Sequence, residues 1–133
     1  MKNILILMLV SLSVSLFAQE KELRTFYEDG TVKSLYMYSD ADNYKVTNFY
    51  QNGKVKEIGQ FAKGKMNGEW ISFNDAGVKS GEASYVNGQK AGEWKIYDTA
   101  GNMRFTINYE NGKMLSATNY DPSGKQVAET HSR

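Results

Sequence analysis

The stretch YVNGQKAGEWKIYDTAG at residues 85–101 specifies the architecture, because it repeats FAKGKMNGEWISFNDAG at residues 61–77. Trp70 and Trp94 hold the same place in the two stretches, 24 residues apart. The same offset relates Phe61, Tyr85 and Tyr109, and likewise Gly64, Gly88 and Gly112. A fixed period of this length is the signature of a repeat architecture.

Each repeat contains two half-units in which an aromatic residue is followed by a glycine, and each half-unit predicts one strand and one turn. Four Asn-Gly dipeptides lie at such places: Asn52-Gly53, Asn67-Gly68, Asn87-Gly88 and Asn111-Gly112. Asn-Gly accepts positive φ at both central positions of a two-residue hairpin turn. We therefore expect a tight hairpin turn at each of the four.

The residues between the turns follow the period of a β-strand. Residues 102–109 alternate polar and apolar, which predicts a strand with one apolar face. In the preceding strand Trp94 and Ile96 share one face, while Lys95 and Tyr97 share the other. Large side chains on both faces indicate a thin sheet with no second layer.

The predicted fold is all-β, with tandem β-hairpin repeats of about 24 residues that form an elongated antiparallel meander. Repeat-equivalent strands are two strand positions apart. Trp70 and Trp94 should therefore lie roughly 10 Å from each other, with intervening side chains filling the gap.

The first residues have the order of a signal peptide, since Lys2 precedes an apolar stretch that ends at Ala18 and a charged run follows. We expect cleavage after Ala18, with an uncleaved N-terminal anchor as the alternative. The predicted organisation is a signal peptide at 1–18, a repeat domain at 19–125 and a frayed C-terminal tail at 126–133. The predicted location is therefore outside the cytoplasm, either periplasmic or extracellular.

Composition argues against two classes of partner. Loss of Lys2 with the leader lowers Lys and Arg from 16 to 15, equal to the 15 Asp and Glu. A nucleic-acid binder needs a surplus of basic residues, so no nucleic-acid partner is expected. We also expect no stable membrane insertion after cleavage.

The residue types that most often carry catalysis are scarce. The chain has no Cys, and its one His is His131, so a triad or a Cys nucleophile cannot be built. Glu69 and Glu93 recur by template and are interpreted as solvated residues rather than a catalytic pair. We expect no enzyme activity, no catalytic residues, no cofactor and no metal site.

A cluster of oxygen-bearing side chains at Asp40, Asp42 and Asn43 resembles part of a Ca²⁺ loop. It lacks the downstream Gly and the bidentate Glu of such a loop. The favoured interpretation is an ordinary polar turn.

The candidate binding residues are aromatic: Trp70, Phe73, Trp94 and Tyr97. Trp and Tyr dominate interface energetics and also stack on sugar rings, so these residues could bind a protein or a glycan. The competing interpretation is that they pack against one another and stabilise the array. The open edges of the sheet also leave room for self-association.

The unit at residues 85–101 resembles the MORN-repeat variant of bacterial proteins catalogued as YwqK-family antitoxins, and the resemblance extends from about Phe26 to Lys125. It implies an all-β hairpin array and a role in toxin neutralisation. With the leader and the scarce catalytic groups, the leading prediction is an exported, non-catalytic protein-interaction or scaffolding module. The alternatives are an antitoxin or immunity-like neutraliser and a glycan-binding surface protein.

Overall fold

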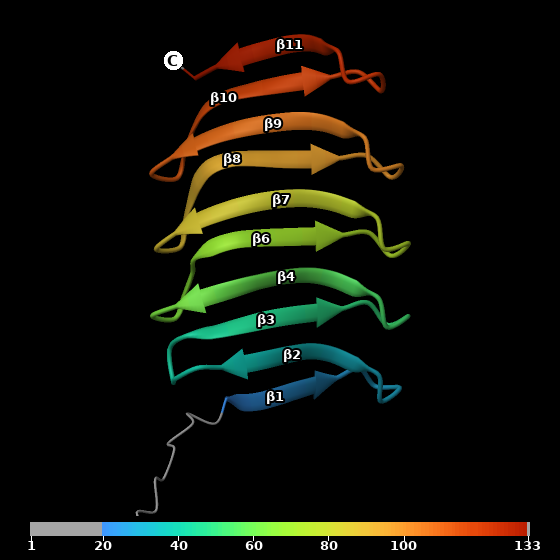
Figure 1. The fold of residues 1–133 in the computed structure, drawn as a ribbon, viewed down its shortest axis with the longest axis vertical. Coiled ribbons are helices and arrows are strands. Elements are labelled where there is room, and N and C mark those ends of the chain that lie inside the picture. Colours follow the sequence, from blue (N-terminus) through green and yellow to red (C-terminus); the bar gives the residue numbers. More distant parts are fainter. Residues whose placement is uncertain (1–19, 133) are drawn as a thin grey trace, which may run out of the picture.

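The chain forms a single antiparallel meander sheet in a computed structural model that describes residues 20–132 (Figure 1). No helix occurs among these residues, so none could span a membrane. The strands are β1 (Lys21–Phe26), β2 (Val32–Tyr38), β3 (Tyr44–Phe49), β4 (Val55–Ala62), β5 (Lys65–Met66), β6 (Gly68–Phe73), β7 (Lys79–Val86), β8 (Gln89–Tyr97), β9 (Met103–Glu110), β10 (Lys113–Tyr120) and β11 (Gln126–His131). The predicted all-β hairpin array is confirmed.

Spatial order follows chain order, with the short β5 paired only to β4. With β5 set aside, each strand therefore pairs with the strands before and after it in the chain, as expected for a quasi-linear array. Val46 and Trp70, 3% and 8% exposed, are the buried hydrophobic residues of the described part. The sheet is one layer thick, and stability comes from cross-strand contacts because no second layer encloses a deep core.

The turns at one end of the strands are five residues long, at 27–31, 50–54, 74–78, 98–102 and 121–125. In the first, Gly30 N–H donates to the Tyr27 carbonyl, and Tyr27 N–H donates to the Thr31 carbonyl. The fourth residue of every such turn is a Gly with φ between 82° and 89°. Asn52-Gly53 belongs to this class. The predicted two-residue turn there is wrong, because Gly53 alone of the pair has positive φ.

At the other end of the strands lie two-residue turns at Lys63-Gly64, Asn87-Gly88 and Asn111-Gly112. Both residues of each pair have positive φ, from 49° to 79°, as a type I′ turn requires. The predictions at Asn87-Gly88 and Asn111-Gly112 are confirmed.

The predicted hairpin turn at Asn67-Gly68 is wrong, because Lys63-Gly64 already reverses the chain. Asn67 N–H instead donates to the Gln60 carbonyl, and Gly68 alone of the pair has positive φ, at 74°. This Asn-Gly pair is an irregularity between β5 and β6 rather than a turn.

Hydrogen bonds between successive hairpins hold both rows of turns in line. Gly88 N–H donates to the Met66 carbonyl at 2.8 Å, and Gly112 N–H donates to the Lys90 carbonyl at 2.9 Å. On the side of the five-residue turns, the Tyr27 hydroxyl donates to the Phe49 carbonyl at 2.7 Å. Each hairpin is thereby tied to the next beyond the strand ladder itself.

The C-terminal residues differ from the sequence-based expectation. Gln126–His131 form β11, which pairs with β10 from Ser116↔His131 to Tyr120↔Gln126. The expected frayed tail is therefore wrong for these residues, because backbone pairing to β10 orders a polar segment that has no apolar period. The predicted signal peptide at 1–18 lies outside the described residues.

Candidate functional site

One face of the sheet carries a continuous row of aromatic rings, here called the aromatic ladder. It consists of Tyr36, Tyr38, Tyr44, Phe61, Trp70, Tyr85, Trp94 and Tyr109. Neighbouring ring centroids are 4.7 to 6.3 Å apart, within the range in which aromatic pairs attract. The ladder crosses strands β2 to β9, and its side of the sheet is called the ladder face.

Trp70 is the most enclosed member of the ladder. It is 8% exposed and packs edge-to-face against Phe61 and Tyr85, with centroid distances of 5.4 and 6.2 Å. Its indole lies on the backbone of Gly59, where a Cβ would overlap the ring. Its indole N–H is buried and finds no hydrogen-bond partner among residues 20–132. Trp70 is therefore a packing residue with little surface to offer a ligand.

Trp94 has a different environment although it occupies the same repeat position. Its indole N–H donates to the Ser84 carbonyl at 3.1 Å. Lys90 Nζ lies 4.8 Å from the Trp94 ring centre and 5.0 Å from that of Tyr109. This cation–π contact places an ammonium group over the rings at the Tyr109 end of the ladder. Tyr85 fills the space between the two Trp residues, which confirms the expected intervening side chain.

An exposed apolar cross-strand pair lies on the ladder face near its Trp94 end. Ile96 on β8 lies opposite Phe105 on β9, and they are 39% and 40% exposed. Strand alternation from Trp94 puts Ile96 on the ladder face, and pairing puts Phe105 there too. The two side chains extend the ladder with apolar surface that no described residue covers.

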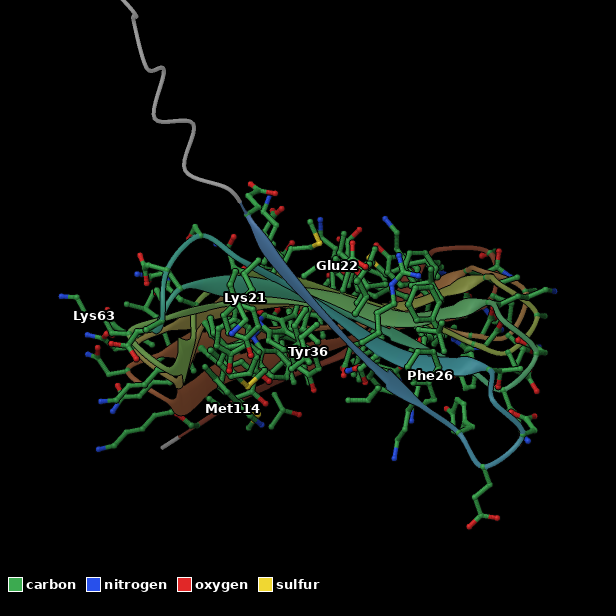
Figure 2. All side chains as sticks on the ribbon, turned by 90° about the horizontal axis from the view of Figure 1, so that it is seen from below. Lys21, Glu22, Phe26, Tyr36, Lys63 and Met114 are labelled. Carbon is green, nitrogen blue, oxygen red and sulfur yellow. The ribbon has the colours of Figure 1, made fainter. Side chains whose placement is uncertain are left out.

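The structure does not bring the four predicted binding residues together. Trp70 and Trp94 are in the ladder, whereas Phe73 and Tyr97 each follow three residues later and alternate to the opposite face. Burial and the neighbouring Glu82 carboxylate raise the pKa of Tyr97, and Glu82 pairs with Ile71 beside Trp70 and so faces away from the ladder. Figure 2, which looks along the sheet, shows the same division, with Glu22 on one side and Tyr36 and Met114 on the other.

The opposite face carries an ion-pair cluster built around Glu82. Lys79 Nζ is 2.6 Å from one Glu82 oxygen, and Lys95 Nζ is 3.8 Å from the other and 3.6 Å from Glu93. The hydrogen bond from Lys79 lowers the pKa of Glu82, and the same bond raises the pKa of Lys79. Burial raises the pKa of Tyr97.

Glu69 and Glu93 line one shallow hollow on this face together with Glu82 and Lys95. Because Lys95 pairs with Glu93 and Glu82, the hollow holds neighbouring charges that partly neutralise one another. Within residues 20–132, no group of three or more His, Cys, Asp or Glu side chains could hold a metal ion.

The Asp40 cluster forms a polar turn that is hydrogen-bonded both internally and to the neighbouring turn at Lys63-Gly64. One carboxylate oxygen of Asp40 accepts hydrogen bonds from the backbone N–H groups of Asp42 and Asn43 and from the Asn43 side chain. The Asn43 side-chain bond is the main cause of the lowered pKa of Asp40. Both Asp40 carboxylate oxygens are thus engaged by Asn43 within the turn, and the Asn43 side-chain oxygen accepts a hydrogen bond from the Lys63 N–H.

Two features of the site escaped sequence reasoning. The first repeat lacks Gly-Glu-Trp and looks irregular, yet Tyr36, Tyr38 and Tyr44 extend the ladder through it. Tyr36 and Tyr38 lie two residues apart in β2, and this spacing was the available sequence signal. Lys90, the second feature, sits four residues before Trp94 and gave no signal, because its contact with the ring depends on strand register.

The fold and the two faces define an all-β repeat protein, and comparison with known families gives the class of repeat. The family described as MORN repeat variant matches residues 19–40, 45–63 and 90–111. These three segments are therefore similar to MORN-variant repeats. No curated protein matches it. The crystal structure of TarM is similar at 17% identity with a TM-score of 0.36, over 81% of this chain and 20% of that one.

Proposed function

We propose that this protein is an exported, non-catalytic interaction module that binds a protein partner through its ladder face. The observation that carries the proposal is the paired exposure of Ile96 and Phe105 beside the ladder, on a sheet with no covering layer in the described residues. Contiguous exposed apolar surface marks interaction sites in soluble proteins. The apolar leader at the N-terminus supports a partner outside the cytoplasm.

The geometry favours a protein over a glycan. Stacking on a sugar ring requires an open aromatic face, and the rings of the ladder pack against each other, with Lys90 over Trp94 and Tyr109. Aliphatic and Phe side chains such as Ile96 and Phe105 suit the apolar centre of a protein interface. A toxin neutraliser would be one special case of such a binder, with the toxin as the partner.

The test compares two isoleucines on opposite faces of the sheet. Ile96 on the ladder face and Ile58 on the other are 39% and 40% exposed, so each can be changed to Lys at similar cost to folding. Immobilised protein without residues 1–18 is exposed to envelope and secreted fractions, and bound proteins are identified and titrated. Burying an Ile at an interface contributes about 1.5–3 kcal/mol, so Ile96→Lys should weaken a specific partner roughly tenfold or more.

Ile58→Lys should leave that binding unchanged, and thermal unfolding should show that both variants are folded. Equal weakening by both variants would contradict the assignment of the ladder face. A specific partner that binds Ile96→Lys as tightly as the unaltered chain would also contradict it.

A further inference from the structure

The two ends of the sheet are open strands. β1 and β11 lie at opposite ends of the array and run in opposite directions (Figure 1). Each pairs with one strand in the described part of the chain, and all residues of both are exposed. An open strand presents unpaired N–H and C=O groups, which are a template for another chain.

The direction of the outward groups follows from the turns. Tyr27 N–H donates inward to Thr31 and Ser132 N–H donates inward to Leu115. Because N–H groups alternate along an antiparallel strand, those of Arg24 on β1 and Glu129 on β11 point outward. Both strands thus have donors and acceptors available to a neighbour.

The repeat gives the register in which β11 would meet β1 of another copy. In β1 and in β10 the pairing register shifts just before a five-residue turn, at Thr25/Phe26 and at Asn119/Tyr120. Arg24 therefore holds the position in β1 that Thr118 holds in β10. β9 and β11 each begin directly after such a turn, so Glu129 corresponds to Thr106.

Inside the chain β9 and β10 pair Thr106↔Thr118 and Asn108↔Ser116. Continuing the meander by the same rule places Glu129 opposite Arg24 of the next copy. It also places His131 opposite Glu22 of the next copy. These positions are therefore cross-strand neighbours across the junction.

The polar side chains at the junction are complementary, with one pair of opposite charges and one imidazole facing a carboxylate. Glu129 meets an Arg, and His131 meets a Glu, on the face away from the ladder. Among the described residues of a single chain, these groups pair only along their own strands, Arg24 with Glu22 and His131 with Glu129, and they remain largely exposed. On the ladder face the same register sets Ala128 opposite Thr25 and Thr130 opposite Leu23, side chains that fit side by side.

We infer that copies of this chain associate head to tail, with β11 of one pairing with β1 of the next. The junction continues the meander without a break and extends the ladder face from copy to copy. The contact joins two different strands, so it does not close on itself as a two-fold dimer does, and it can add further copies.

Blocking one strand at a time tests the arrangement. Proline at a position whose N–H points outward removes a junction donor and leaves pairing within the chain intact. Arg24→Pro blocks β1 and Glu129→Pro blocks β11. By analytical ultracentrifugation the unaltered protein should form species larger than a dimer as its concentration rises, and each variant alone should remain monomeric.

An equimolar mixture of the two proline variants should form a one-to-one dimer and nothing larger. The unblocked β11 of the Arg24→Pro variant can then pair with the unblocked β1 of the Glu129→Pro variant. Association by either variant alone would overturn the proposal, since it would show that two identical strands pair. A mixture that stays monomeric would overturn it as well. Far-ultraviolet circular dichroism checks that both variants keep the sheet.

Charge reversal tests the register with less risk to folding. Arg24→Glu and Glu129→Arg should each weaken association roughly fivefold by placing like charges opposite each other. The double variant should recover most of the loss. Lys45→Glu makes the same charge change on the same face in the middle of the sheet, and it should have no effect. Equal weakening by Lys45→Glu, or a double variant weaker than either single one, would overturn the register.

Discussion

At the scale of residues, the same template position serves different purposes in different repeats. Trp70 lies on Gly59, is 8% exposed and has an unpaired indole N–H. Trp94 lies one repeat later, where Ala83 replaces Gly59, and its N–H reaches the Ser84 carbonyl. The lack of a Cβ at Gly59 in the neighbouring strand therefore lets the Trp70 indole lie directly on the backbone.

Gly59→Ala should destabilise the protein by about 1–3 kcal/mol, because the new Cβ would force the Trp70 indole off the backbone. Gly59 has no positive φ, so the cost is steric rather than conformational. Chemical denaturation measures the change.

The control for this variant is the same substitution in a Trp70→Ala background. There the added methyl group has room, and the cost of Gly59→Ala should largely vanish. If Gly59→Ala costs as much without the indole as with it, the contact is not the cause.

At the scale of elements, the five-residue turns share one backbone shape but differ in the hydrogen bonds that the side chain of their first residue makes. In the last three turns the first residue is Asn74, Asp98 or Asp121, and its side chain accepts N–H groups within the turn. In the first two turns that residue is Tyr27 or Tyr50, whose hydroxyl instead donates to the next hairpin. The turn geometry is constant because the glycine at the fourth position sets it.

The two five-residue turns that begin with Asp98 and Asp121 should make the free energy of unfolding decrease at low pH. Hydrogen bonding, chiefly from Asn102 N–H, lowers the pKa of Asp98 below its ordinary value of 3.8. A lowered pKa gives stability that is present above 3.8 and is lost as pH falls through the folded-state value. Thermal unfolding between about pH 5 and pH 2 should therefore show a smaller fall for Asp98→Asn than for the unaltered chain.

Asn74 provides the precedent for that substitution, because it accepts Ala76 and Val78 N–H groups without a charge. At neutral pH Asp98→Asn should accordingly stay folded. An acid-induced fall as steep in Asp98→Asn as in the unaltered chain would contradict the role of this carboxylate.

At the scale of the whole molecule, the described residues form a line of strands in which strand pairing passes only between neighbours, and hydrogen bonds at the turns reach one hairpin further. Such an array lacks a single core, so stability is a sum of local terms and the ends open most easily. The terminal strands have every residue exposed, whereas the middle strands hold the enclosed part of the ladder.

Amide hydrogen exchange should show this gradient, with β1 and β11 exchanging fastest and β6 to β8 slowest. The measurement is made in dilute solution, where copies are separate. Uniform protection from end to end would mean that the array unfolds as one cooperative unit.

The tandem β-hairpin class was predictable because its signals are local. The 24-residue offset between Trp70 and Trp94, the alternation in residues 102–109 and the Asn-Gly pairs at residues 87 and 111 each describe a few neighbouring residues. Turn dipeptides and side-chain alternation act within such a span. Asn67-Gly68 misled for the same reason, since Lys63-Gly64 had already made the turn.

The candidate site depended on contacts between strands. Sequence alone determined the repeat, its period and which residues are aromatic. Only the tertiary structure decided that Trp70 is enclosed, that Tyr97 faces away from it, that Ile96 meets Phe105 and that residues 126–131 form a strand. These outcomes depend on strand register. The bulges and irregularities shift that register by one or two residues, and no local pattern records the sum of the shifts.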